Sequence, residues 1–130
     1  MIHLEHVSRT YRDGEQEVVA LAALDVDIAA GETVALVGRS GSGKSTLLHL
    51  IGGLEWPTTG TVRVADVELG GLDDQALTHF RLHRIGFVFQ FFHLLPSLSV
   101  WENLLLPAEL AGLPAREARR KAEALLNAVG

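Results

Sequence analysis

The first thirty residues alternate between apolar and polar side chains, as half-exposed strands do. Ile2 and Leu4 lie two positions apart in the segment 2–11, which predicts a strand with one apolar face. The segment 17–31 repeats the pattern, with apolar residues on either side of two aspartates and a glycine at its end. A turn over residues 13–15 separates the two predicted strands.

Two short runs are almost entirely apolar, which is typical of strands buried in a parallel sheet. They are TVALV at residues 33–37 and IGFVF at residues 85–89. A helix is predicted to begin within residues 38–46, directly after the first run. It is expected to end at Gly52 or Gly53, because glycine often terminates helices.

The remaining pattern predicts a hairpin and three helices. The segment 61–69 alternates again, so it predicts a strand or hairpin. The segment 73–84 has an acidic start and a basic end, which suits a helix dipole. Ser99 and Glu102 have capping-box spacing, so a helix is expected to begin there, and another is expected over 114–129. The order of elements predicts an α/β protein with an attached antiparallel layer.

Composition narrows the class of protein. The chain has 130 residues, of which 48% are hydrophobic, so one compact domain is expected. Its net charge of −5 makes nucleic acid a poor candidate partner, and the absence of cysteine excludes disulfides and thiolate chemistry. The N-terminus is not a signal peptide, and no apolar run approaches the roughly 20 residues needed to cross a bilayer. We expect a soluble chain whose membrane connection, if it has one, runs through a partner.

The segment GRSGSGKST at residues 38–46 matches G-x-x-x-x-G-K-[ST], the phosphate-loop motif of nucleotide-binding proteins. An apolar run precedes it and a helical pattern follows it, which is the context that the motif requires. Glycine allows successive backbone N–H groups to point inward, where they bind phosphate oxygens together with the positive end of the helix. The candidate nucleotide-binding residues of this loop are Gly38, Ser40, Gly41, Ser42, Gly43, Lys44, Ser45 and Thr46.

Three side chains of the loop have separate predicted tasks. Lys44 is expected to reach the β- and γ-phosphates, the Ser45 hydroxyl to hold Mg²⁺, and Thr46 to contact the α-phosphate. The alternative is a turn rich in glycine and serine that binds nothing. That alternative leaves the joint presence of motif, preceding strand and following helix unexplained, so we expect the loop to bind a nucleotide with Mg²⁺.

Two longer stretches resemble the ATP-binding domain of ABC transporters. They are residues 38–64 and residues 81–107, and the second is most similar to the subfamily that exports or extracts lipoproteins, macrolides and related substrates. The resemblance covers essentially the whole chain and corresponds to the N-terminal half, or slightly more, of such a domain. It implies a P-loop NTPase core with an antiparallel β-subdomain and the start of an α-helical subdomain. On this reading residues 1–130 are a partial domain.

The resemblance also implies roles outside the phosphate loop. Tyr11 occupies the position of an aromatic residue that stacks on adenine, although it could simply cover the sheet edge. Gln90 matches a glutamine that contacts Mg²⁺ or the attacking water, although glutamine is common at strand ends. The segment 91–104 resembles the part that meets a coupling helix of the membrane permease subunit. Its residues Phe91, Phe92, Leu94 and Leu95 could instead belong to the core.

Several family elements are absent from the sequence after Gln90. These are the signature loop, the Walker B aspartate with its catalytic glutamate, and the switch histidine. Residues 68–73 superficially resemble a signature loop, but they precede Gln90 and suit a turn better. Without a carboxylate base the chain is expected to hydrolyse ATP poorly by itself. The apolar runs 33–37 and 85–89 are expected to need neighbouring strands, and an open sheet edge favours aggregation.

The favoured hypothesis is an ATP-binding subunit that drives export or extraction by a membrane permease. The resemblance places it on the inner face of the membrane and pairs two intact domains head to tail. One alternative is a small phosphate-loop kinase, for which the basic run 116–121 is the only candidate lid; otherwise that run is expected to be a solvated face. Another alternative is a non-catalytic nucleotide-binding module.

Overall fold

The computed structural model describes all 130 residues and divides into two compact units, Met1–Arg81 and Leu82–Gly130. The first unit is built on a four-stranded antiparallel sheet with the strand order β2-β1-β3-β4. Its strands are β1 (Ile2–Asp13), β2 (Gln16–Ile28), β3 (Thr59–Val64) and β4 (Val67–Glu68). The predicted N-terminal strand pair and the later hairpin are therefore confirmed.

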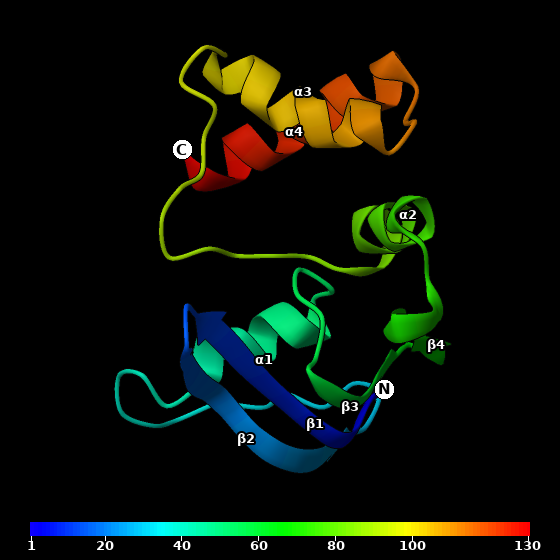
Figure 1. Cartoon of the computed structure of the whole chain (residues 1–130). Helices are drawn as coiled ribbons and strands as arrows, with labels where there is room; N and C mark the ends of the chain where they lie inside the picture. The colour runs from blue at the N-terminus through cyan, green and yellow to red at the C-terminus, as the bar shows by residue number, and fades with distance from the viewer. The chain divides into compact units, whose positions relative to one another are not determined.

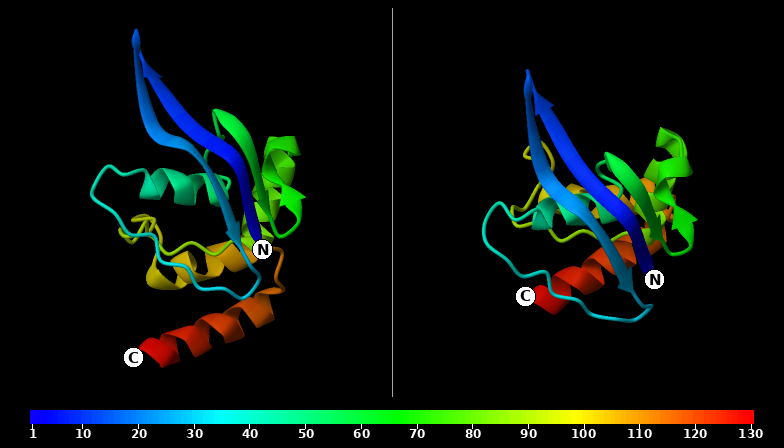
Figure 2. Two further views of the ribbon diagram at one scale, coloured as in Figure 1. Left: turned by 90° about the horizontal axis from the view of Figure 1, so that it is seen from below. Right: turned by 60° about the horizontal axis from the view of Figure 1, so that its bottom comes forward.

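The β1–β2 hairpin is longer than the rest of the sheet (Figure 2). Strand β3 pairs with β1 only as far as the Ser8–Thr59 pair, whereas β2 follows β1 to the Asp13–Gln16 pair. Tyr11 lies in the part of β1 that only β2 accompanies, where its register partner is Val18. The outer end of the hairpin thus presents side chains beyond the core of the sheet.

Helix α1 (Lys44–Ile51) lies against this sheet and contacts β2 and β3 (Figure 1). It begins at the lysine of the phosphate-loop motif and ends before Gly52, as the sequence predicts. Leu47 and Leu50 are its buried residues. The other buried apolar side chains of the first unit are Leu4, Val7, Leu21, Val62, Val64, Leu69, Leu77 and Phe80.

A short 3-10 turn, η1 (Leu69–Gly71), and helix α2 (Asp74–Arg84) follow β4. The 3-10 turn confirms that this glycine-containing stretch is a turn. The Asp73 carboxylate accepts a hydrogen bond from the backbone N–H of Ala76 at 2.8 Å, so the acidic start predicted for this helix serves as its cap. Arg81 donates to the carbonyl of Gly53 at 2.8 Å and so fastens α2 to the end of α1.

The two apolar runs predicted as buried strands are not strands in the structure. Residues 33–37 and 85–89 pair with none of the four strands of the sheet. Val37 is 89% exposed, and Val88 is fully exposed. Their apolar side chains favour burial, but a segment forms a strand only where a neighbouring strand pairs with its backbone N–H and C=O groups. No segment of the chain acts as that neighbour.

The second unit contains two helices, α3 (Val100–Leu110) and α4 (Ala115–Val129), which form an antiparallel pair (Figures 1 and 2). Its small core consists of Leu105, Ala118 and Ala122, against which Trp101, Leu104, Ala108 and Leu113 pack. Both helices agree with the prediction from the sequence. No helix of the structure combines the length and apolar character required to span a membrane.

The predicted capping box at the start of α3 is confirmed. The Ser99 hydroxyl accepts from the backbone N–H of Glu102 at 3.2 Å, and the Glu102 carboxylate accepts from the backbone N–H of Ser99 at 2.7 Å. The Ser99 hydroxyl also donates to the Glu102 carboxylate at 2.7 Å, and this bond, together with that from the Ser99 backbone N–H, holds the pKa of Glu102 below its usual value. Two helix-end N–H groups are thereby satisfied.

Ser99→Ala is expected to lower the free energy of unfolding by about 1 kcal/mol, because one of these N–H groups loses its acceptor. Urea unfolding followed by circular dichroism at the helical band measures the change. Ser97→Ala in the same loop is the control and is expected to stay within about 0.5 kcal/mol of the unmodified chain. Equal effects of the two substitutions would contradict the capping role.

Candidate nucleotide-binding site

The phosphate loop joins the unpaired segment 33–37 to the first residue of α1. It borders a pocket of about 390 Å³, the other wall of which is the outer part of β2. The pocket is lined by Val18, Val19, Ala20, Ser40, Gly41, Ser42, Gly43, Lys44, Ser45 and Thr46. Seven of the eight predicted loop residues therefore surround one space. The eighth, Gly38, lines an adjoining hollow of about 270 Å³ together with Ser42 and Lys44.

Gly43 sets the distance between the loop and the sheet. It caps α1 with φ of 85°, a conformation that favours glycine. A Cβ atom at this position would lie 2.6 Å from the carbonyl oxygen of Ala20 and 3.1 Å from Leu21 Cδ1. The backbone of the loop thus approaches β2 more closely than a side chain permits.

The Lys44 ammonium group lies over the loop. Its Nζ atom donates to the carbonyl oxygens of Arg39 at 2.7 Å and Gly38 at 3.0 Å, and to the Ser42 hydroxyl at 3.3 Å. The ion pairs of the chain do not include Lys44, so no carboxylate compensates its charge. A lysine held by neutral oxygens at the N-terminal end of a helix is suited to binding an anion.

The donor set at this loop fits a magnesium ion that is held mainly by a bound polyphosphate. Ser45 and Thr46 place hydroxyl groups along the pocket. No group of three or more histidine, cysteine or acidic side chains forms a metal cage anywhere in the chain. Magnesium commonly takes one or two protein ligands and completes its shell with phosphate oxygens and water, so a single hydroxyl ligand such as Ser45 is compatible with this ion.

Tyr11 lies one strand away from the phosphate pocket, opposite the pocket-lining Val18. The guanidinium of Arg9 lies over its ring, with 4.6 Å between the guanidinium carbon and the ring centroid. The Tyr11 hydroxyl donates to the Glu55 carboxylate. The ring is partly exposed, at 37%, so it is accessible to a planar ligand.

Glu55 joins this group of side chains and was not singled out by the sequence. Its carboxylate lies 3.3 Å from Arg9 Nε and 3.0 Å from His49 Nδ1. The hydrogen bond from Tyr11 is the main reason that the pKa of Glu55 lies below its usual value, and His49 and Arg9 act in the same direction against the opposing effect of burial. His49 therefore has a structural role as a partner of Glu55.

Gln90 belongs to the second unit, where it follows the unpaired segment 85–89 and is exposed. Its contact with Mg²⁺ or the attacking water stays a prediction. In the same unit, His93 Nδ1 lies 2.6 Å from the carbonyl of Phe91 and its ring packs against Phe89. These local contacts give His93 a structural role.

Phe91, Phe92, Leu94 and Leu95 are all exposed, so the alternative that they belong to the core of this chain is wrong. Phe91 is 71% exposed and Phe92 is 90% exposed. The side chain of Asn103 holds the far end of this segment through hydrogen bonds with the backbone of Leu95, Leu98 and Ser99. The segment thus exposes bulky apolar side chains, while hydrogen bonds with Asn103 hold the backbone at its far end.

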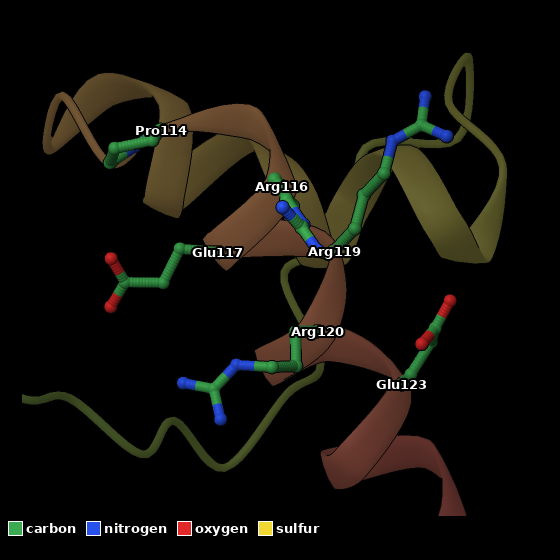
Figure 3. A pocket seen from close by; sticks show the side chains of 6 residues that line it. All are labelled: Pro114, Arg116, Glu117, Arg119, Arg120 and Glu123. Carbon is green, nitrogen blue, oxygen red and sulfur yellow. The ribbon is translucent and has the colours of Figure 1, made fainter.

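A larger hollow, of about 670 Å³, lies along the N-terminal half of α4. Figure 3 shows its side chains, which fan out in different directions. It is lined by Pro114, Arg116, Glu117, Arg119, Arg120 and Glu123. Lys121 forms an ion pair with Glu117 at 2.9 Å, and that contact holds the pKa of Glu117 below its usual value. Arg116, Arg119, Arg120 and Lys121 are all exposed, which confirms the interpretation of residues 116–121 as a solvated face.

Comparison with known proteins identifies the family of the chain. Residues 13–130 match the family model described as ABC transporter. The chain is 47% identical over its whole length to the lipoprotein-releasing system ATP-binding protein LolD of Chromohalobacter salexigens, and 49% identical over 99% of its length to that of Granulibacter bethesdensis. It spans 55% and 56% of those relatives, respectively.

Solved structures give the same assignment of fold. The structure is similar to that of the ATP-binding cassette MJ0796 in a dimeric post-hydrolysis state bound to ADP and Pi. The TM-score is 0.90 at 41% sequence identity, and the match covers 98% of this chain and 56% of that one. A second dimeric structure of the same bacterial ABC transporter cassette gives a TM-score of 0.91 at 42% identity.

Proposed function

This chain belongs to the ABC transporter family of ATP-binding domains, and from that premise we propose that it binds ATP between its phosphate loop and the Tyr11 ring. Membership of this family decides against the small kinase. The observation that carries the proposal is that Lys44, which has no carboxylate partner, lines a pocket whose opposite wall is strand β2. Val18 on that wall is the register partner of Tyr11. Phosphates and base would then be bound by neighbouring parts of one unit.

In the proposed complex the loop N–H groups and Lys44 bind the phosphate oxygens, while the Tyr11 ring supports adenine on the face that Arg9 does not cover. Ser45 and Gln90 are the proposed ligands of Mg²⁺, which would neutralise phosphate charge. None of the residues that line the phosphate pocket is acidic. We therefore propose that the 130-residue chain binds ATP but hydrolyses it slowly, because no carboxylate positions the attacking water.

We also propose that the complete protein acts as the ATPase subunit of a transporter. Its permease subunit would contact the exposed apolar segment around Phe91 and Phe92, and this contact would hold the protein at the inner face of the membrane. Two intact domains would pair head to tail. The names of its relatives, which belong to a lipoprotein-releasing system, support export or extraction as the direction of transport.

Titration of the purified chain with ATP and Mg²⁺, followed by isothermal calorimetry, tests the binding proposal. We expect saturable uptake at one site and a turnover rate close to that of buffer. Folded protein that takes up no ATP would refute the proposal. Rapid turnover that depends on Lys44 would refute the proposed inactivity of the chain and leave the binding proposal standing.

A further inference from the structure

We infer that Glu55 is a positioning residue, which holds the Tyr11 ring at a set place relative to the phosphate loop so that one ligand reaches both. The inference rests on the proposed binding of ATP and concerns how its base is oriented. Glu55 is not among the residues that line the phosphate pocket. It acts through Tyr11.

The Glu55 carboxylate holds the Tyr11 ring in two ways, directly through the phenol hydroxyl and indirectly through Arg9. It accepts the hydrogen bond of the phenol hydroxyl. The same oxygen lies 3.3 Å from Arg9 Nε, and the guanidinium of Arg9 covers one face of the ring. Arg9 Nε is buried and has no hydrogen-bond partner, so this ion pair is its compensation. A base can then stack only on the opposite face.

Glu55 also connects the ring to the helix that carries the phosphate loop. Its second oxygen lies 3.0 Å from Nδ1 of His49, which is on α1. The backbone N–H of Leu54 donates to the His49 carbonyl at 2.8 Å, and that of Glu55 does so at 3.4 Å. His49 is five residues after Lys44, or roughly 7.5 Å along the helix axis. Strand β1 and helix α1 are therefore joined by a single carboxylate.

This arrangement separates two contributions to affinity. The phosphate loop makes its contacts without Glu55, whereas base stacking depends on where the ring is held. Loss of Glu55 should therefore weaken binding of ATP and leave binding of a phosphate chain alone unchanged. Stacking of a base on an aromatic side chain changes affinity by about 5- to 150-fold, so a loss of about 10-fold is expected when the ring remains but is no longer held.

The test compares ATP with inorganic tripolyphosphate, each titrated with Mg²⁺ into the 130-residue chain. For Glu55→Ala we expect ATP affinity to fall about 10-fold and tripolyphosphate affinity to stay within about 2-fold. Tyr11→Phe, which keeps the ring and removes only the hydroxyl, should show the same split to a smaller degree. Glu55→Gln keeps an acceptor for the hydroxyl and should recover part of the loss.

Glu17→Ala is the matched control, because Glu17 lies on the same hairpin but its carboxylate pairs with Arg12, at 3.0 Å, rather than with Tyr11. It should change neither affinity. An equal loss for both ligands, or no loss of ATP affinity in folded Glu55→Ala or Tyr11→Phe, would overturn the inference while the proposed function stands. Failure of the unmodified chain to bind either ligand would overturn both.

Discussion

Lys44→Ala is expected to weaken binding of ATP by about 100-fold or more, which corresponds to about 3 kcal/mol. The ammonium of Lys44 is held over the loop by two carbonyls and a hydroxyl, and no carboxylate compensates it. Phosphate oxygens offer it charge-assisted hydrogen bonds that are stronger than those to neutral carbonyls. Isothermal calorimetry with ATP and Mg²⁺ measures the loss, and tripolyphosphate should be affected as strongly as ATP.

The chain offers a matched control, because its other lysine, Lys121, lies on α4 in an ion pair with Glu117. Lys121→Ala removes the same charge from the second unit and is expected to leave ATP affinity unchanged. Retention of full ATP affinity by folded Lys44→Ala would show that the loop is not the phosphate site. A comparable loss in Lys121→Ala would show that net charge, rather than the position of Lys44, governs binding.

Gly60→Ala is expected to lower the free energy of unfolding by about 3 kcal/mol or more. Gly60 has φ of 82°, and a Cβ atom there would lie 2.3 Å from the carbonyl oxygen of Glu5 and 2.4 Å from the carbonyl carbon and oxygen of His6. These are backbone atoms of β1, so they cannot move aside as the end of a flexible side chain can. Relief of the overlap requires β3 to separate from β1 beside their register shift.

Urea unfolding followed by circular dichroism measures the change in stability. Gly14→Ala is the control, because Gly14 also has positive φ, at 61°, but a Cβ atom there would meet nothing within 4 Å. It should cost about 1 kcal/mol, which is the effect of backbone conformation alone. If the two variants were equally stable, the close approach of β3 to β1 would not be a determinant of stability.

Local sequence signals account for much of what the structure contains. The motif with Lys44, the capping box at Ser99 and the alternation along residues 2–11 each depend on residues close together in the chain. Spacing of this kind specifies a helix start, a cap or a strand face without knowledge of the rest of the fold. All three predictions are confirmed.

Features that depend on distant segments could not be predicted in this way. Glu55 meets Tyr11 across 44 positions, and nothing about a glutamate after a helix indicates that contact. For the runs 33–37 and 85–89 the apolar pattern is clear, but no strand of the chain pairs with them. Apolar periodicity reports a preference for burial, whereas strand formation also depends on a partner.

The unpaired segment 33–37 has a thermodynamic consequence for the loop that follows it. Gly43, packed against Ala20, and helix α1 hold the loop at one end, whereas the segment at its other end has no ladder of hydrogen bonds. Such a loop has more conformational entropy to lose when an anion orders it. Binding of a nucleotide to the 130-residue chain is therefore expected to be opposed by conformational entropy. The favourable enthalpy of its hydrogen bonds and charge interactions is expected to drive binding.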